Sequence, residues 1–215
     1  MPSLADLQSF VDENIRKGLS GAIFVAPMSV TDEITALRDA TGLLALPSGY
    51  TDVGRITKDQ GASWTREVST SDTMSLGASQ PTRVDITADV TGLAFTMQES
   101  KRQVFELHEG LDLSAVQYDT NGNVSWDKPD RPRQDYYRVL ALFKDGDGVD
   151  AVYFAKWCPR MRVTDRGEQS WNEENELQYP VTMQAFEDED FGTSVRSLWA
   201  GPTDRLAAMG FTAAA

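Results

Sequence analysis

The sequence predicts a mainly β (α+β) fold: a single domain over residues 1–215, with one flanking helix and a short N-terminal helix. Several segments alternate apolar and polar residues with the period of two that is typical of strands. Glycine-containing turns separate these segments, and helical spacing of apolar residues is limited to short stretches. A chain of 215 residues is long enough for one large domain with its own core.

The N-terminal region predicts a helix over residues 3–17. Its apolar residues form one helical stripe, which consists of Leu4, Leu7, Val11 and Ile15. Ser3 can cap this helix and Gly18 ends it. A shorter helix is predicted over residues 32–40, followed by a glycine- and proline-rich loop over residues 41–63. Because loops of this length are usually functional, we expect it to be mobile in a free monomer and ordered by a neighbouring molecule.

Residues 82–90 show the clearest strand pattern. The apolar positions alternate and form one face, made of Val84, Ile86, Ala88 and Val90. The polar positions form the opposite face, made of Arg83, Asp85, Thr87 and Asp89. The apolar phase changes at Leu93, which predicts a β-bulge at Thr91–Gly92.

Three strand regions follow. Residues 116–126 are expected to form a hairpin about an Asn-Gly pair, a strong signal for a type I′ turn. Residues 136–143 and 151–157 are apolar on both faces, which predicts a central hairpin. Residues 177–185 alternate again, and Pro180 favours an edge position for this strand.

A helix is predicted between these strands, over residues 101–109. Val104 and Leu107 lie on one side of it, and we expect them to pack on the sheet. Lys101 and Arg102 stand at its start, where positive charge opposes the helix macrodipole. We therefore expect these two charges to meet acids outside the helix.

Residue types that carry catalysis or bind metals do not form a recognisable site. His108 is the only histidine, and neither a zinc-protease helix nor a Ser-His-Asp triad can be built around it. A calcium-binding loop that begins at residue 145 would need glycine at its sixth position and glutamate at its twelfth, where this chain has Asp150 and Lys156. Cys158 is the only cysteine and is expected to be buried and inert. We therefore expect no enzyme activity, cofactor, metal, signal peptide or membrane partner.

Charge is unevenly distributed along the chain, whose net charge is −13. Residues 165–190 hold nine acids and one base, whereas residues 128–144 hold five bases and two acids. Subunits that dock head to tail can use such a separation, because one face complements the next. A solvated loop is the other interpretation of the acidic run. The candidate inter-subunit residues are Lys101, Arg102, Glu187, Asp188, Glu189 and Asp190.

Three stretches resemble those of one known family. Residues 53–61 are similar to its glycine-bounded turn before a first long strand, and residues 93–99 to its strand that runs into a helix at a glutamate. Residues 177–183 are similar to its late strand with a Tyr-Pro-Val-Thr step. In this order, over about residues 20–190, the chain resembles the major tail tube proteins of long-tailed (siphovirus-type) bacteriophages. Residues 97–116 look most like the major tail proteins of phages that infect actinobacteria.

The resemblance implies a tail-tube-type β-sandwich or barrel that serves as a structural subunit. It implies hexameric rings that stack into a hollow tube with a β-barrel lumen, through which DNA passes during ejection without specific binding. Other tail proteins would bind at the tube ends. The implied locations are the virion tail and, during assembly, the host cytoplasm.

An acidic lumen would suit the passage of DNA, because DNA carries one negative charge per about 1.7 Å of its axis and would bind to a basic wall. Asp85, Thr87 and Asp89 are the candidates for facing this lumen. The same polar face would suit the outer surface of a sandwich. The alternative function is a β-sandwich binding module, such as a capsid decoration or carbohydrate-binding domain, which would need neither the long loop nor the separated charge.

Overall fold

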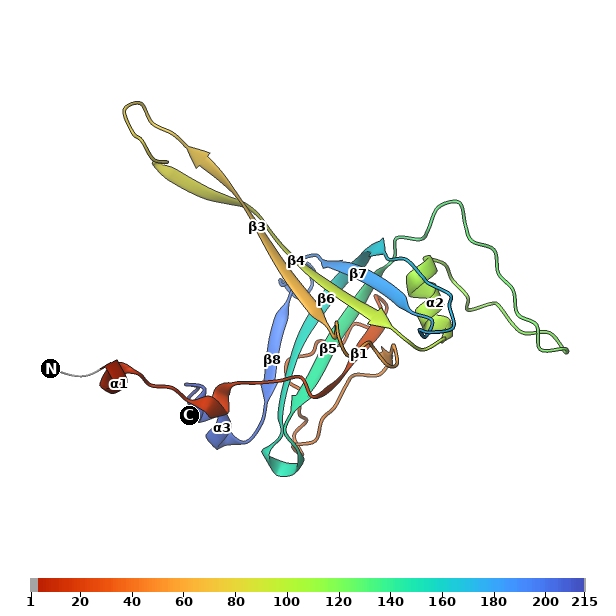
Figure 1. Ribbon diagram of the computed structural model, residues 1–215, viewed down its shortest axis with the longest axis horizontal. Coiled ribbons are helices and arrows are strands. Elements are labelled where there is room, and N and C mark those ends of the chain that lie inside the picture. The colour runs from red at the N-terminus through yellow and green to blue at the C-terminus, as the bar shows by residue number, and fades with distance from the viewer. Residues whose placement is uncertain (1–3, 215) are drawn as a thin grey trace.

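The computed structural model describes residues 4–214 and is dominated by one eight-stranded sheet (Figure 1). The strands are β1 (Ser20–Pro27), β2 (Thr51–Asp52), β3 (Ser63–Thr73), β4 (Arg83–Met97), β5 (Tyr136–Asp145), β6 (Val152–Arg166), β7 (Tyr179–Ala185) and β8 (Arg196–Ala200). The helices are α1 (Leu4–Leu7), α2 (Arg102–Glu109) and α3 (Thr203–Ala208), with 3-10 turns at Asp12–Asn14 and Gly148–Asp150. The antiparallel strands run in the order β2-β1-β5-β6-β7-β4-β3, and β8 pairs with β6. The predicted mainly β (α+β) class is confirmed.

The sheet curves around its main core, because strands from distant places in the strand order contribute to one cluster. Ile23 of β1 and Phe95 of β4 are both fully buried in this cluster. The helix α2 lies against β7 and β6, and its Val104 and Leu107 are buried in the same core. Gly110 ends α2 in the left-handed conformation, with a φ of 71°. The body is therefore a strongly curved sheet with α2 on its flank.

A second core covers the opposite face of β5 and β6. Leu140 and Trp157 are fully buried there, together with Ile34 and Leu37 from the segment that precedes β2. The indole nitrogen of Trp157 donates a hydrogen bond of 2.9 Å to the Tyr50 hydroxyl. Both faces of β5 and β6 are therefore covered, which explains why the pattern of this central hairpin is apolar on both sides.

The strand β6 changes its partner strand at Pro159. On one edge, β8 pairs with Tyr153–Trp157 and β7 pairs with Met161–Arg166. On the other edge, β5 pairs along nearly the whole strand, with a register shift opposite Pro159. Because proline has no backbone N–H, it fits the point where the ladder is interrupted.

The predicted helix over residues 3–17 is wrong in extent. Only α1 and a 3-10 turn form in this region, and Ser3 lies outside the described residues. Leu7 and Ile15 are exposed, so the apolar stripe lacks a packing surface in the described part of the chain. A helix this short is marginal without such a surface.

The segment between β1 and β3 also differs from expectation. In place of a helix over residues 32–40, Asp39 closes a turn by accepting hydrogen bonds from the backbone N–H groups of Thr41, at 2.8 Å, and Leu43, at 3.1 Å. The 41–63 segment is largely irregular and contains β2. Val53 is fully buried in the main core, so this part of the segment is anchored to the body.

Residues 116–126 keep a turn at the Asn-Gly pair but form no strand pair, and the predicted type I′ is wrong because Asn121 lacks the positive φ that this type requires. The Asp119 backbone N–H donates to the Asn123 carbonyl at 2.8 Å, and the Asp119 carboxylate accepts from the Asn121 backbone. The flanking residues belong to a long excursion that extends away from the body (Figure 1). A two-stranded pair without a packing surface is marginal in water, which explains the missing ladder.

Pro180 lies in an interior strand, which corrects the edge prediction, because β7 is placed between β6 and β4. The Pro180 carbonyl accepts a hydrogen bond from Gly167, which follows β6. The backbone nitrogen of Pro180 also points toward the β6 side, beyond the last β6–β7 pair, which joins Arg166 and Val181. Proline is therefore tolerated because the β6 ladder has already ended there.

Candidate assembly surfaces

The longest projection from the body is the hairpin arm, defined here as residues 65–91 of β3, β4 and their turn (Figure 1). At its root, Leu93 and Phe95 of β4 are fully buried. Farther out, the side chains on both faces of the ribbon lie mostly in water. The arm therefore has two wet faces in the isolated chain.

A β-bulge at Thr87 decides which residues share a face. Ser69 pairs with Ala88 and Thr70 pairs with Ile86, so Thr87 is the additional residue in β4. The predicted bulge at Thr91–Gly92 is therefore wrong in place. Because an additional residue reverses the alternation, the pattern of residues 82–90 changes phase within the strand.

The bulge separates the three residues that were expected to share one polar face. Asp85 pairs with Ser71, whereas Asp89 pairs with Val68, and cross-strand partners lie on the same face. Positions 69 and 71 lie on one face of β3 and position 68 on the other. Asp85 and Asp89 therefore point to opposite sides of the arm, which corrects the grouping of Asp85, Thr87 and Asp89.

The two faces differ in chemistry. The polar face includes Glu67, Ser69, Ser71, Thr73, Arg83 and Asp85, whereas the charged residues Arg66, Asp72 and Asp89 lie on the other face. The other face, called here the apolar arm face, carries Val68, Val84 and Ile86 with exposed fractions of 47%, 57% and 71%. Such exposure on one side of a projecting ribbon indicates a contact surface.

Two of the three aspartates of the arm, Asp85 and Asp89, have arginine partners. Arg66 donates to Asp89 from Nε at 2.9 Å, and this hydrogen bond lowers the pKa of Asp89. Arg83 donates to Asp85 from Nε at 2.7 Å. The Thr87 hydroxyl donates to the Ser69 carbonyl at 3.1 Å. Since each of these two aspartates is locally neutralised, the negative charge of the polar face depends strongly on Glu67.

The start of α2 finds partners in its own chain. Lys101 lies 2.8 Å from the Glu99 carboxylate and 3.6 Å from that of Asp52, and the hydrogen bond to Glu99 raises the pKa of Lys101. Arg102 lies 3.7 Å from Glu106. The acids outside the helix that Lys101 was expected to meet are therefore in this chain, and the macrodipole argument does not require a neighbouring subunit.

The turn at residues 53–61 and the stretch at 93–99 meet beside α2. Glu99 accepts a hydrogen bond of 2.7 Å from the Arg55 backbone, and Gln98 donates to the Arg55 carbonyl at 2.9 Å. Gly54 has a φ of +88°, and a Cβ at this position would lie 2.5 Å from the Glu99 carboxyl carbon. Glycine is therefore required where this turn crosses the end of β4.

The acidic run at residues 187–190 is divided between interior and surface. Asp188 is 4% exposed and lies 3.1 Å from Nη1 of Arg138, which is itself 2% exposed. Glu187, Glu189 and Asp190 are exposed. The placement of Asp188 among exposed inter-subunit residues is wrong, because its carboxylate balances a buried guanidinium.

Arg138 connects three parts of the second core. It donates to the Val30 carbonyl, and its Nη1 donates to the Pro159 carbonyl at 3.0 Å. Its guanidinium lies 4.8 Å from the centre of the Phe191 ring. Sequence reasoning missed this residue, whose five donors hold the loop after β1, the point where β6 changes its partner strand and the acidic turn together.

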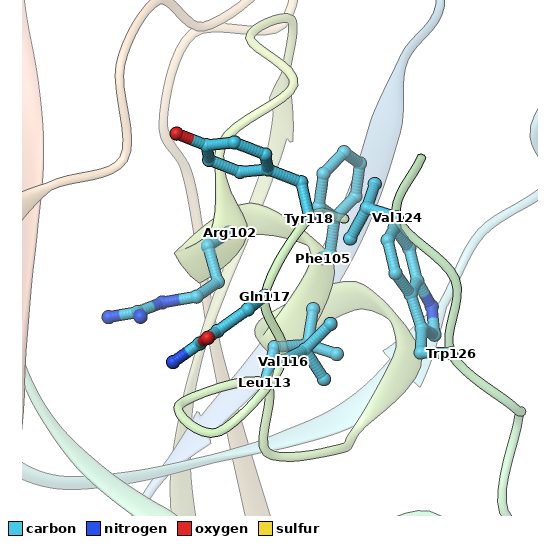
Figure 2. A pocket seen from close by; sticks show the side chains of 8 residues that line it. All are labelled: Arg102, Phe105, Leu113, Val116, Gln117, Tyr118, Val124 and Trp126. Atoms are coloured by element: carbon cyan, nitrogen blue, oxygen red, sulfur yellow. The ribbon is translucent and has the colours of Figure 1, made fainter. Parts of the chain in front are cut away.

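A mostly apolar groove lies between α2 and the excursion that follows it (Figure 2). This α2 groove has a volume of about 640 Å³ and is lined by Arg102, Phe105, Leu113, Val116, Gln117, Tyr118, Val124 and Trp126. Phe105 and Trp126 lie with ring centres 5.1 Å apart. The polar ends of Arg102 and Gln117 lie together on one side of the groove (Figure 2).

The two ends of the described chain meet on the other side of the body (Figure 1). The Asn14 side chain donates to the Ala208 carbonyl at 2.8 Å, and Glu13 forms an ion pair with Arg205 of α3. These contacts fix where the N-terminal segment, defined here as residues 4–19, leaves the body. Sequence reasoning did not predict α3.

The only cysteine and the only histidine, Cys158 and His108, do not form a catalytic or metal-binding group. Burial raises the pKa of Cys158 to about 12 and lowers the pKa of His108, whose Nε2 lies 3.3 Å from the Gly167 carbonyl. Within residues 4–214, no three histidine, cysteine, aspartate or glutamate side chains are grouped to hold a metal ion. No helix in the same range is long and apolar enough to cross a membrane.

Comparison with known proteins identifies one family. A family model described as phage tail tube protein matches residues 9–198. Among solved structures, the crystal structure of Hcp1 from Salmonella typhimurium aligns with 86% of this chain and 97% of its own chain, at 10% sequence identity and a TM-score of 0.31. A similarity at that level does not by itself define a fold. A search of curated proteins found no match.

Proposed function

The chain belongs to the phage tail tube protein family, and we propose that its copies form hexameric rings that stack into a hollow tube and conduct DNA during ejection. The protein is a structural subunit of a phage tail. From the stretches at 53–61, 93–99 and 177–183, we infer a long-tailed (siphovirus-type) phage, and from residues 97–116 an actinobacterial host. The single domain assembles in the host cytoplasm, and other tail proteins bind at the tube ends.

The hairpin arm is the observation that carries this proposal. It is a long two-stranded ribbon, and a ribbon of this kind is marginal in water when nothing covers it. Val68, Val84 and Ile86 leave the apolar arm face largely in water in the isolated chain. In a ring, a neighbouring subunit would cover this face, and the arm would become part of a closed wall that has no free sheet edge.

The polar face of the arm is then the wall that DNA passes. Asp85 and Glu67 lie on this face, whereas Asp89 lies with the apolar arm face and would point toward protein. Repeated around each ring, these acids form bands of negative charge. Screening limits the repulsion to about 8 Å from the wall at physiological salt, so the charge governs friction with DNA rather than subunit folding.

Negative-stain electron microscopy of the concentrated, purified protein tests the proposed assembly. Rings and stacked tubes are expected. A protein that stays a compact monomer at every concentration and salt condition would reject the tube and favour the binding-module alternative.

A charge-reversal pair tests the lumen. Tubes of the double variant Glu67→Lys and Asp85→Lys should bind free DNA, with an affinity that falls steeply as salt rises. The matched control is the pair Asp72→Lys and Asp89→Lys, which makes the same change in charge at two strand positions on the opposite face. Equal DNA binding by tubes of the two pairs would show that the polar face is not the lumen wall.

A further inference from the structure

The N-terminal segment exposes more apolar surface than a segment in water normally does. Its large side chains Leu4, Leu7, Phe10, Ile15 and Leu19 are between 66% and 79% exposed. Contiguous exposed apolar residues of this kind mark interaction sites. The stripe Leu4, Leu7 and Val11 has the spacing with which amphipathic helices anchor in grooves.

The N-terminal segment cannot reach the α2 groove of its own chain, because the two lie at opposite ends of the body. Asn14 and Glu13 hold its base against α3, and the residues before them lead away from the body on that side (Figure 1). The α2 groove lies toward the opposite end of the longest axis, beside α2 and the excursion that follows it (Figure 1). An occupant for the groove must therefore come from another molecule.

The groove has the chemistry to receive such a segment. Its base is formed by Leu113, which is 3% exposed, and by the paired rings of Phe105 and Trp126. Its outer side chains, Tyr118 and Val124, are exposed at 79% and 53% and would be covered by an occupant. The polar ends of Arg102 and Gln117 lie on one side of the groove, and the indole nitrogen of Trp126, on the other side, donates a hydrogen bond to Glu109 (Figure 2).

Charge at the two surfaces is complementary. The part of the segment beyond the Glu13–Arg205 ion pair, residues 4–12, contains acids, including Asp12, and no lysine or arginine; Arg16 and Lys17 lie at the fixed base. The one charged side chain that lines the groove is Arg102, which is 63% exposed and has only a loose contact of 3.7 Å with Glu106. An acidic apolar segment therefore matches this groove better than a basic one would.

We propose that the N-terminal segment of one copy docks as a helix in the α2 groove of a second copy. This inference rests on the proposed tube, and it names the contact that connects neighbouring subunits. The two surfaces are different and lie at opposite ends of the molecule, so the contact is heterologous and propagates from copy to copy. Docking supplies the packing surface that the stripe lacks, and α1 lengthens toward the helix that the stripe encodes.

Disulfide trapping in full-length protein tests the contact. Leu7→Cys and Val124→Cys proteins are mixed under conditions in which electron microscopy shows tubes, and then oxidised. A covalent dimer that contains one copy of each variant is expected. Both positions are exposed, and the native Cys158 is buried, so neither substitution disturbs the core and the native thiol does not compete.

The control pairs Leu7→Cys with Leu76→Cys, which places a more accessible thiol at the end of the hairpin arm. Assembled tubes without the Leu7–Val124 dimer, or with equal dimer in the control pair, would overturn the docking and leave the tube intact. Failure of the unmodified protein to form rings or tubes would instead overturn the proposed function. As a second variant, Leu7→Asp should abolish the tubes while circular dichroism of the monomer keeps its strand signal.

Discussion

The substitution Asp188→Asn distinguishes a buried structural charge from a contact between subunits. The Asp188 carboxylate is 3.1 Å from Arg138, and both residues are almost completely buried. Asparagine keeps the shape but removes the charge, so the guanidinium is left in the core without a counter-ion. Breaking a buried ion pair in this way costs about 3–5 kcal/mol of the free energy of unfolding. For a chain of 215 residues, that corresponds to a fall in Tm of roughly 6–20 °C.

Thermal unfolding of the monomer, followed by circular dichroism, measures this loss. Glu187→Gln and Glu189→Gln are matched controls, since both remove a negative charge from the same turn at exposed positions. Each control should change stability by no more than about 0.5 kcal/mol. The reasoning fails if Asp188→Asn unfolds at the same temperature as the controls and instead impairs only tube formation.

Three further predictions concern the core, the long loop and pH. Leu107→Ala should lower the free energy of unfolding by about 2–5 kcal/mol, because Leu107 is buried on the side of α2 that packs on the sheet. The control variant Leu43→Ala, at an exposed position, should unfold at the normal temperature. Deleting residues 48–60 should destabilise the monomer, because the deletion removes Val53 from the core; a deletion variant with normal Tm would contradict that placement. Burial lowers the pKa of His108, so the contribution of His108 to stability should be constant above its ordinary pKa of 6.5 and fall as pH drops through it. His108→Gln should flatten this dependence in thermal unfolding, and an unchanged profile would assign it to other groups.

Elements with local and consistent signals could be predicted from the sequence. The β5–β6 hairpin is apolar on both faces because two cores cover it. Its long apolar runs predict this burial from the sequence alone. The helix α2 has Val104 and Leu107 one turn apart and a glycine at its C-terminal cap. In both cases the packing surface lies within the same chain, so the local pattern and the tertiary structure agree.

Elements whose signal depends on residues that are distant in the sequence could not be predicted. Gly21 and Ala22, near the start of β1, weaken the strand pattern of this segment. The glycine is nevertheless needed, because a Cβ at Gly21 would overlap the Phe143 ring of β5. The pairing of Arg138 with Asp188 joins residues fifty positions apart. Nothing in the acidic run distinguishes Asp188 from its exposed neighbours until Arg138 is placed.

The hairpin arm shows how one residue changes a functional assignment. Thr87 is of a type that strands favour, so the bulge at this position leaves no mark in the sequence, and strict alternation places Asp85 and Asp89 together. The register of β3 separates them. Because Val68, Val84 and Ile86 share a face with Asp89, covering these apolar side chains turns Asp89 toward a neighbouring subunit and leaves Glu67 and Asp85 in water. Burial of apolar area therefore selects the wet face of the arm, independently of any resemblance to known tubes.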